Sequence, residues 1–243
     1  MNRNYVRSVS LRRPLPADSY LNTLLAVRAL SGEEGLAFPG PVTFLVGENG
    51  TGKSTLLEAI AVACGFNAEG GSRNFRVSTR DTHSELGEYL TAVRGDYPKD
   101  GFFLRAESFY DAASYLDSLG RGALDSYGGV SLHGQSHGES FLALVQNRFG
   151  GCGLYLLDEP EAALSPTPQL ALMGEIHRLI GRRSQFIIAT HSPILMAFPG
   201  ACIYELSGEG IQKVDYRETE HYCLTKTFLN DPERMLRNLF SKE

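Results

Sequence analysis

The chain has 243 residues, 42% of them hydrophobic and 21% charged, which is long enough for one α/β domain with a small subdomain. A net charge of −5 excludes a whole-surface attraction to nucleic acid or anionic membrane, and the local arginine clusters are interpreted as solvated surface. No apolar signal core is present, and no stretch approaches the ~20 apolar residues of a membrane span. We therefore expect a cytoplasmic protein without membrane insertion.

The predicted elements begin with an edge strand at 5–11, where apolar and polar residues partly alternate before two prolines. The apolar run 42–46 predicts a buried strand that stops at a glycine-rich loop. Apolar residues then recur at helical spacing from 56 to 64. Residues 65–81 are polar and glycine-rich, which is typical of a loop with a short hairpin.

The remaining chain alternates strand and helix patterns. We expect strands at 102–104, 154–157, 186–189 and 203–206. We expect helices at 109–119, 141–149, 167–180, 218–229 and 232–240, with a glycine-rich connector at 120–134. Strands that alternate with helices predict a mostly parallel sheet covered on both faces, with an antiparallel N-terminal edge.

Residues 47–54 match the phosphate-loop pattern G-x-x-x-x-G-K-[ST] in full. Glycines let successive backbone N–H groups point at an anion, and the following helix adds its partial positive charge. Lys53 can reach the β- and γ-phosphates, and the Ser54 hydroxyl can ligate Mg²⁺. An incidental glycine-rich turn is the alternative, but the loop stands between a predicted strand and a predicted helix. The predicted nucleotide-binding residues here are Gly47, Asn49, Gly50, Thr51, Gly52, Lys53, Ser54 and Thr55.

Polar side chains end two of the buried strands. Asp158 and Glu159 follow the run 154–157, and His191 follows the run 186–189. In a parallel sheet the carboxyl ends of the strands meet at the ligand crevice. Asp158 is suited to hold Mg²⁺, Glu159 to act as general base on water, and His191 to orient that water or bond the γ-phosphate. A strand-to-turn exit and a structural histidine are the alternatives for these residues taken singly.

These motifs in this order resemble the ABC-type ATPases. Ser136-His137-Gly138-Glu139, ahead of the Asp-Glu strand, then stands where that family has its Ser-Gly-Gly-Gln signature. Taken in isolation the tetrapeptide reads as a helix N-cap with a nearby glycine. The resemblance implies that Ser136, Gly138 and Glu139 of one copy close over ATP held by a second copy, in a homodimer with composite sites.

The residues that follow the two acids, at 160–166, and those that follow the histidine, at 192–193, are similar in sequence to the soluble, non-transporter branch of the family. That branch includes RecF-like and SMC-like proteins and small bacterial AAA-labelled predicted ATPases of DNA maintenance and phage defence. The chain has no heptad run between its phosphate loop and signature, so a long coiled-coil arm is not expected. Glu107 is the candidate for the family's Q-loop position, with a surface acid as the alternative. Arg12 and Tyr20 are candidate adenine contacts.

We therefore expect a single ABC-type ATPase domain over 1–243, with a subdomain at about 66–150 that carries the signature. The expected activity is ATP hydrolysis, with Glu159, His191 and Lys53 as catalytic residues and with Mg²⁺ on Ser54 and Asp158. Besides a second copy, an unidentified protein and DNA are candidate partners, although the composition does not indicate nucleic-acid contact. Two alternatives stay open, which are the ATP-binding subunit of a membrane transporter and an ATP-sensing switch with incidental turnover.

Overall fold

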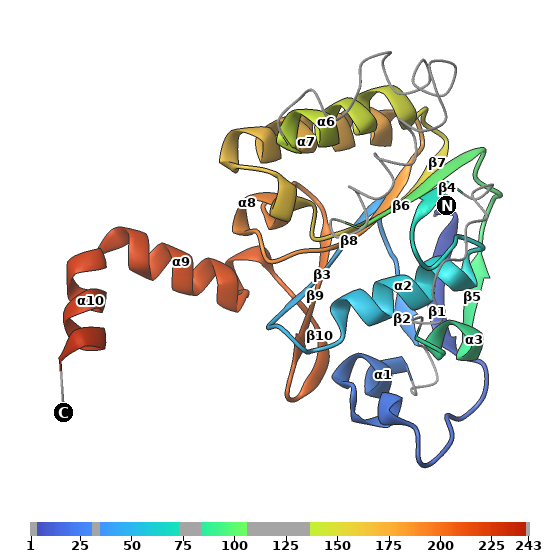
Figure 1. Cartoon of the computed structure of the whole chain (residues 1–243), viewed down its shortest axis with the longest axis horizontal. Helices are drawn as coiled ribbons and strands as arrows, with labels where there is room; N and C mark the ends of the chain where they lie inside the picture. The colour runs from blue at the N-terminus through green and yellow to red at the C-terminus, as the bar shows by residue number, and fades with distance from the viewer. Residues whose placement is uncertain (1–3, 31–34, 73–83, 106–136, 242–243) are drawn as a thin grey trace.

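A computed structural model gives the structure of residues 4–30, 35–72, 84–105 and 137–241 (Figure 1). The strands are β1 (Val6–Leu11), β2 (Leu36–Ala37), β3 (Val42–Gly47), β4 (Gly71–Ser72), β5 (Leu90–Arg94), β6 (Asp100–Arg105), β7 (Gly153–Asp158), β8 (Gln185–Ala189), β9 (Cys202–Ser207) and β10 (Gly210–Val214). The α-helices are α1 (Leu25–Leu30), α2 (Lys53–Ala63), α3 (Leu86–Tyr89), α6 (His137–Arg148), α7 (Pro166–Gly181), α8 (Pro193–Met196), α9 (Glu220–Asn230) and α10 (Pro232–Phe240). Three 3₁₀ helices among the described residues are η1 (Tyr20–Thr23), η4 (Pro160–Ala163) and η5 (Tyr216–Glu218).

A mostly parallel sheet forms the centre of the molecule. Its order in the described chain is β10-β9-β3-β8-β7-β6-β4. The five inner strands pair in parallel, whereas β10 and β4 are antiparallel to their neighbours at the two edges. Every residue of β3, β7 and β8 is buried, which explains why these strands have continuous apolar runs rather than alternating patterns. The expected α/β architecture is confirmed.

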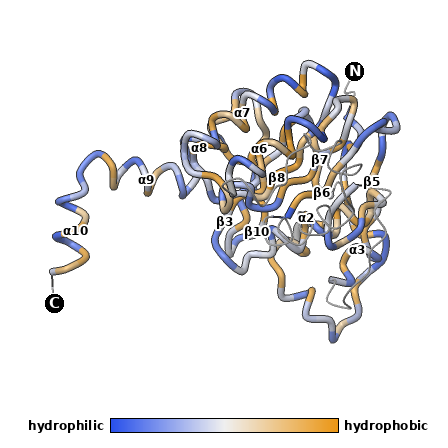
Figure 2. Tube along the Cα trace, turned by 45° about the horizontal axis from the view of Figure 1, so that its top comes forward, coloured by the Kyte–Doolittle hydropathy of each residue, from blue (hydrophilic) through white to orange (hydrophobic). Residues whose placement is uncertain are grey.

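Helices cover both faces of this sheet (Figure 1). Along β7, Leu154 and Leu156 pack into the core beneath α2, whereas Tyr155 and Leu157 pack into the core beneath α6 and α7. Because successive strand residues point to opposite faces, one apolar run supplies both cores. Figure 2 shows the apolar strands β6, β7 and β8 gathered inside the molecule. Full burial of each large aliphatic side chain stabilises the fold by about 1.5–3 kcal/mol.

A second, antiparallel sheet of order β2-β1-β5 adds to the core on the α2 side. The N-terminal strand is therefore antiparallel, as expected, and it lies in a sheet of its own. The Gln185 side chain joins the two sheets, because its amide donates to Val6 O (2.8 Å) and its oxygen accepts from Val6 N (2.9 Å). This sheet packs against α2 in the same hydrophobic core, so it helps to hold the helix that follows the glycine-rich loop in place.

The C-terminal helices α9 and α10 extend away from the body (Figure 1). None of their residues is buried, and Leu229, Leu239 and Phe240 are each at least 70% exposed. Their helical patterns were predicted correctly at 218–229 and 232–240. The first turn of α9 contacts the body, through His221 beside His191 and through the Glu220 N–H, which donates to Glu205 Oε1.

Part of the predicted organisation falls outside the described residues. The helix expected at 109–119 and the connector expected at 120–134 lie there, as does much of the subdomain expected at 66–150. The division into core and subdomain therefore stays a prediction. No described helix combines the length and the apolar character needed to cross a lipid bilayer.

Candidate active site

The glycine-rich loop connects the end of β3 to the beginning of α2. Gly47 has φ +139°, and a Cβ atom there would lie 2.3 Å from Leu206 O, so glycine is required on both grounds. Gly52, directly before α2, has φ +92°. The chain can therefore turn sharply and aim the first N–H groups of α2 at the space in front of the loop. These groups have no partner within the helix, which makes this end of α2 suited to an anion.

Lys53 lies inside the curve of this loop. Its ammonium donates to Gly47 O (2.8 Å) and to Glu48 O (3.0 Å), and the residue is 4% exposed. Burial lowers the pKa of Lys53, and the carboxylates of Glu159 and Asp158 counteract this shift. A buried ammonium that is held by two backbone carbonyls of the loop is positioned to neutralise an anion that binds there.

Three further predicted residues, Asn49, Thr51 and Thr55, lie in the loop and in the first turn of α2. Thr51 donates its hydroxyl to Glu48 O at 2.9 Å, which closes a turn. Asn49 is exposed at the tip, and Thr55 is half-buried in the first turn of α2. The structure therefore places all eight predicted loop residues in one continuous strand–loop–helix segment.

Ser54 and Asp158 meet at the carboxyl end of the sheet. The Ser54 hydroxyl donates to Asp158 Oδ1 at 2.9 Å, although the two residues are 104 positions apart. Both side chains supply hard oxygen ligands. Neighbouring ligands of an octahedral Mg²⁺ with bonds of about 2.1 Å lie about 3 Å apart, so this pair fits such an ion.

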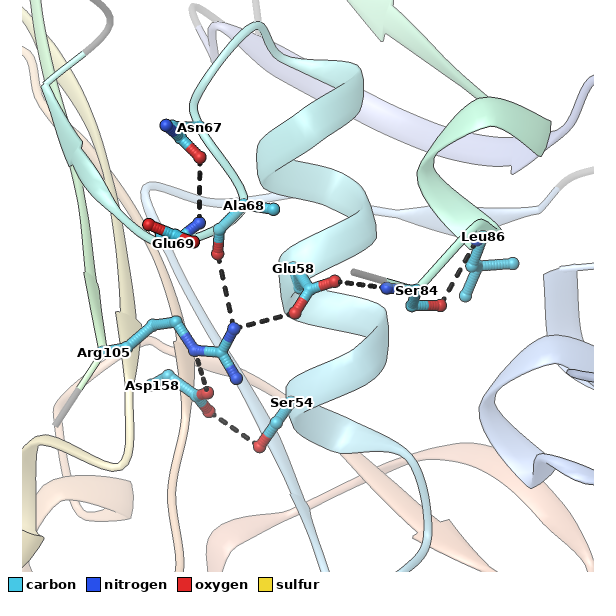
Figure 3. Close-up of polar contacts among 9 residues, drawn as sticks. All are labelled: Ser54, Glu58, Asn67, Ala68, Glu69, Ser84, Leu86, Arg105 and Asp158. Atoms are coloured by element: carbon cyan, nitrogen blue, oxygen red, sulfur yellow. Dashed lines mark hydrogen bonds and ion pairs between the residues drawn. The ribbon is translucent and has the colours of Figure 1, made fainter. Parts of the chain in front are cut away.

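Arg105 lies beside this pair, at the end of β6 (Figure 3). Its guanidinium contacts Glu58 Oε2 at 2.8 Å, Ala68 O at 3.3 Å and Asp158 Oδ2 at 3.8 Å. Glu58 on α2 also accepts from Ser84 N at 3.0 Å. Arg105 therefore connects the Asp158 carboxylate, a candidate metal ligand, to Glu58 on α2 and to Ala68 between α2 and β4. The strand expected at 102–104 ends one residue before Arg105, and sequence reasoning missed this residue because its position opposite Asp158 comes from the strand register of the folded sheet.

Replacing Arg105 by Met is expected to lower the free energy of unfolding by about 2–3 kcal/mol. The reason is that the Glu58 side chain, which is only 8% exposed, would lose the positive charge that compensates its carboxylate. This is less than a fully buried pair would lose, since Arg105 itself is 22% exposed. Urea denaturation measures the change. Arg178→Met is the matched control, because its pair with Glu175 lies on the surface and its loss should lower stability by less than about 1 kcal/mol. Equal effects of the two variants would contradict the buried network.

Glu159 begins the turn after β7 in a left-handed conformation, with φ 48° and ψ 52°. Its backbone N–H donates to Ala189 O at 2.9 Å, which holds the strained turn against β8. The carboxylate is 40% exposed and lies 3.5 Å from His191 Nε2. The Glu159 carboxylate is therefore accessible to water and has a histidine beside it.

His191 is held from two sides. Its backbone N–H donates to a carboxylate oxygen of Glu161, and its Nδ1 lies 3.1 Å from Nε2 of His221. Burial, together with the Lys53 ammonium, lowers the pKa of His191, and the Glu159 carboxylate counteracts this. The imidazole is therefore neutral near pH 7. Burial raises the pKa of Glu161. Sequence reasoning missed His221, which no motif marks.

The signature residues lie on the other face of the sheet. Gly138 and Glu139 begin α6, and a Cβ atom on Gly138 would lie 3.3 Å from Ala163 O in η4. This places them beside the turn that follows Glu159, whereas the phosphate loop leads into α2 on the opposite face. One copy of the chain therefore does not bring these residues onto its own loop. Ser136 lies outside the described residues.

The described structure does not place the candidates for the Q-loop position and for the adenine contact among the loop, acid and histidine residues. Glu107 lies outside the described residues. Arg12 is exposed after β1, and Tyr20 is 60% exposed on η1. The segment after η1 does reach the loop, because Ala26 would be 3.2 Å from a Cβ atom on Gly52.

The fold and the arrangement of these motifs are those of an ABC-type P-loop ATPase domain. Family models agree: one for an AAA domain matches residues 23–97, and one for an AAA domain described as "putative AbiEii toxin, Type IV TA system" matches residues 140–197. The first match contains the phosphate loop and the second contains the acids and the histidine.

Comparison with known proteins gives similar sequences and similar solved structures. The chain is 28% identical to the ribose import ATP-binding protein RbsA 2 of Escherichia coli O157:H7, over 88% of this chain and 46% of that protein. It thus spans about half the length of this curated relative. The structure of cbiO1 from Clostridium perfringens, part of the ABC transporter complex cbiONQ, aligns with a TM-score of 0.51 and 18% identity over 95% of this chain and 97% of that one. The SMC head domain from Thermotoga maritima aligns with a TM-score of 0.42 and 16% identity over 74% and 92%.

Proposed function

We propose that this chain binds MgATP at the phosphate loop and hydrolyses it to ADP and phosphate. The observation that carries the proposal is convergence at one edge of the sheet. Ser54 contacts Asp158, His191 lies 3.5 Å from Glu159, and the carboxylates of both acids act electrostatically on Lys53. These are the groups that phosphoryl transfer to water requires.

Each group has a role that follows from its position. The loop N–H groups and the Lys53 ammonium bind the terminal phosphates and neutralise their charge. Ser54 and Asp158 would hold Mg²⁺, which supplies further charge neutralisation when bound. The exposed Glu159 carboxylate accepts a proton from the attacking water. His191 donates from Nε2 to hold that water or a γ-phosphate oxygen.

We further propose that the active form is a dimer of two copies that close around ATP. The support is the position of Gly138 and Glu139, which lie beside η4 and across the sheet from their own loop. A second copy, facing the first, would bring its α6 N-terminus with Ser136 over that loop. In this arrangement the two copies share two composite sites.

Three candidate roles are proposed for the ATP cycle. The residues after Glu159 and His191 favour the soluble branch that acts in DNA maintenance or phage defence. The curated relative named for ribose import favours the second candidate, which is the ATP-binding subunit of a membrane transporter. A regulatory switch that senses ATP is the third candidate, and it predicts ATP-dependent dimers with negligible turnover.

We expect the purified chain to release phosphate from ATP with saturable kinetics and a turnover of about 0.01–10 s⁻¹, within and below the usual enzyme range. The measurement is continuous phosphate release with and without Mg²⁺ and with increasing double-stranded DNA. Loss of turnover in EDTA supports the metal-dependent site. Stimulation by DNA supports the first setting, whereas co-purification with a membrane protein supports the second. The absence of both ATP binding and phosphate release would contradict the proposal.

A further inference from the structure

His221 and His191 form a pair at the junction between the body and the C-terminal helices. His221 stands in the first turn of α9, and its Nε2 lies 3.1 Å from Nδ1 of His191. The two rings are tilted by 55° with centroids 5.3 Å apart, so the contact is between ring edges rather than stacked faces. On its other side, His191 Nε2 lies 3.5 Å from Glu159 Oε1. Glu159, His191 and His221 thus form a row that leads from the open site to α9.

One of the two facing nitrogens must carry the proton they share. A neutral imidazole has one N–H and one bare nitrogen, so the neighbour of one ring nitrogen decides the state of the other. If His221 Nε2–H donates, His191 keeps its own proton on Nε2, where it faces Glu159. If His191 Nδ1–H donates instead, a bare Nε2 lone pair faces the Glu159 carboxylate, which is repulsive. The geometry favours the first arrangement.

The surroundings of His191 agree with this arrangement. The charged or titratable groups facing it are Glu159 after β7, Glu161 in η4, Lys53 on α2 and His221 on α9, with Glu48 of the loop farther out. The outer nitrogens of the two rings, His191 Nε2 and His221 Nδ1, are both buried without a hydrogen-bond partner in the described part of the chain, but His191 Nε2 has the Glu159 carboxylate 3.5 Å away. An N–H group on His191 Nε2 is therefore stabilised by a nearby negative charge, whereas an N–H group on His221 Nδ1 would be buried and unpaired. That again leaves the His221 proton on Nε2.

We propose that His221 is a positioning residue, which donates to His191 Nδ1 and thereby keeps the His191 proton on Nε2 for the γ-phosphate side of the site. The inference rests on the proposed ATP hydrolysis. It also makes turnover depend on how the start of α9 is seated on the body. That seat is well defined: Thr219 is fully buried, and the N–H of Glu220 donates to Glu205 Oε1 at 3.0 Å.

The test compares four variants. In His221→Gln the side-chain amide nitrogen reaches about as far as Nε2 and can donate, whereas in His221→Asn it reaches only as far as Nδ1, and His221→Ala has no donor. We expect turnover at saturating MgATP to fall about 10- to 100-fold in the Asn and Ala variants, with ATP affinity nearly unchanged, and to stay within about 3-fold in the Gln variant. His177→Ala, at an exposed position on α7, is the matched control and should equal the parent. Equal turnover in all variants would overturn the proposal.

A second measurement does not depend on turnover. Long-range ¹H–¹⁵N spectra of ¹⁵N-histidine-labelled protein report which ring nitrogen is protonated, and His191→Gln identifies the His191 signals. The parent should show a protonated Nε2 and a bare Nδ1 on His191, and His221→Ala should shift His191 toward a mixture of tautomers. A protonated Nδ1 in the parent, or an unchanged tautomer in His221→Ala, would refute the role of His221. If the parent shows no hydrolysis, the proposed function fails while the tautomer result still stands.

Discussion

Glu159→Gln is expected to bind MgATP as the parent does and to hydrolyse it about 10²- to 10⁴-fold more slowly, which is the usual contribution of a general base. Gln has the same shape, so it keeps the left-handed backbone at this position and the contact with the His191 side, but its amide cannot accept a proton from water. The proposed dimer opens only after hydrolysis. The variant should therefore accumulate as a dimer in the presence of MgATP.

Single-turnover phosphate release and size-exclusion chromatography with and without MgATP measure these two effects. Glu175→Gln is the matched control, because this carboxylate pairs with Arg178 on the surface of α7. It should keep parental turnover and the parental elution profile. A Glu159→Gln protein that stays monomeric with ATP and hydrolyses it normally would rule out the general-base role and the dimer cycle together.

The strands of the central sheet could be predicted because their sequence pattern has a simple physical origin. Strands buried on both faces need apolar residues at every position, and 154–157 and 186–189 show such runs. Each run then ends in polar residues, and parallel strands bring those ends to one edge. The proximity of Asp158, Glu159 and the phosphate loop was predicted on this basis, although the roles of these residues stay predictions.

The small antiparallel sheet shows why other elements were missed. β5 is short and partly exposed, with no continuous apolar run, and it pairs with β1 from 79 (Leu11 with Leu90) to 88 (Val6 with Arg94) positions away. β10 likewise has no buried residue. Such strands form because a neighbour supplies the hydrogen bonds, and a local sequence pattern does not contain the neighbour.

Arg105 and His221 were missed for a related reason. Each lies outside the motifs and acts through a tertiary contact: Arg105 through Glu58 and Asp158, and His221 through His191. Their residue types are common on surfaces, so neither stands out until the fold places it beside a group with strong charge or hydrogen-bonding needs. The helical pattern at 232–240 likewise does not tell that Leu239 and Phe240 are exposed.

Lys53→Ala is expected to weaken ATP binding by about 1.5–3 kcal/mol, which is roughly 10- to 150-fold, because a charge-assisted hydrogen bond to the terminal phosphates is lost. The folded state should tolerate the change, since the lowered pKa of Lys53 shows that its buried environment disfavours the charged form. Titration calorimetry with MgATP measures the affinity, and urea denaturation without nucleotide measures the stability. Lys213→Ala, at an exposed position on β10, is the matched control and should bind as the parent does. If Lys53→Ala kept parental affinity, the ammonium inside the loop would have no part in nucleotide binding, and the anion site would have to be sought elsewhere in the fold.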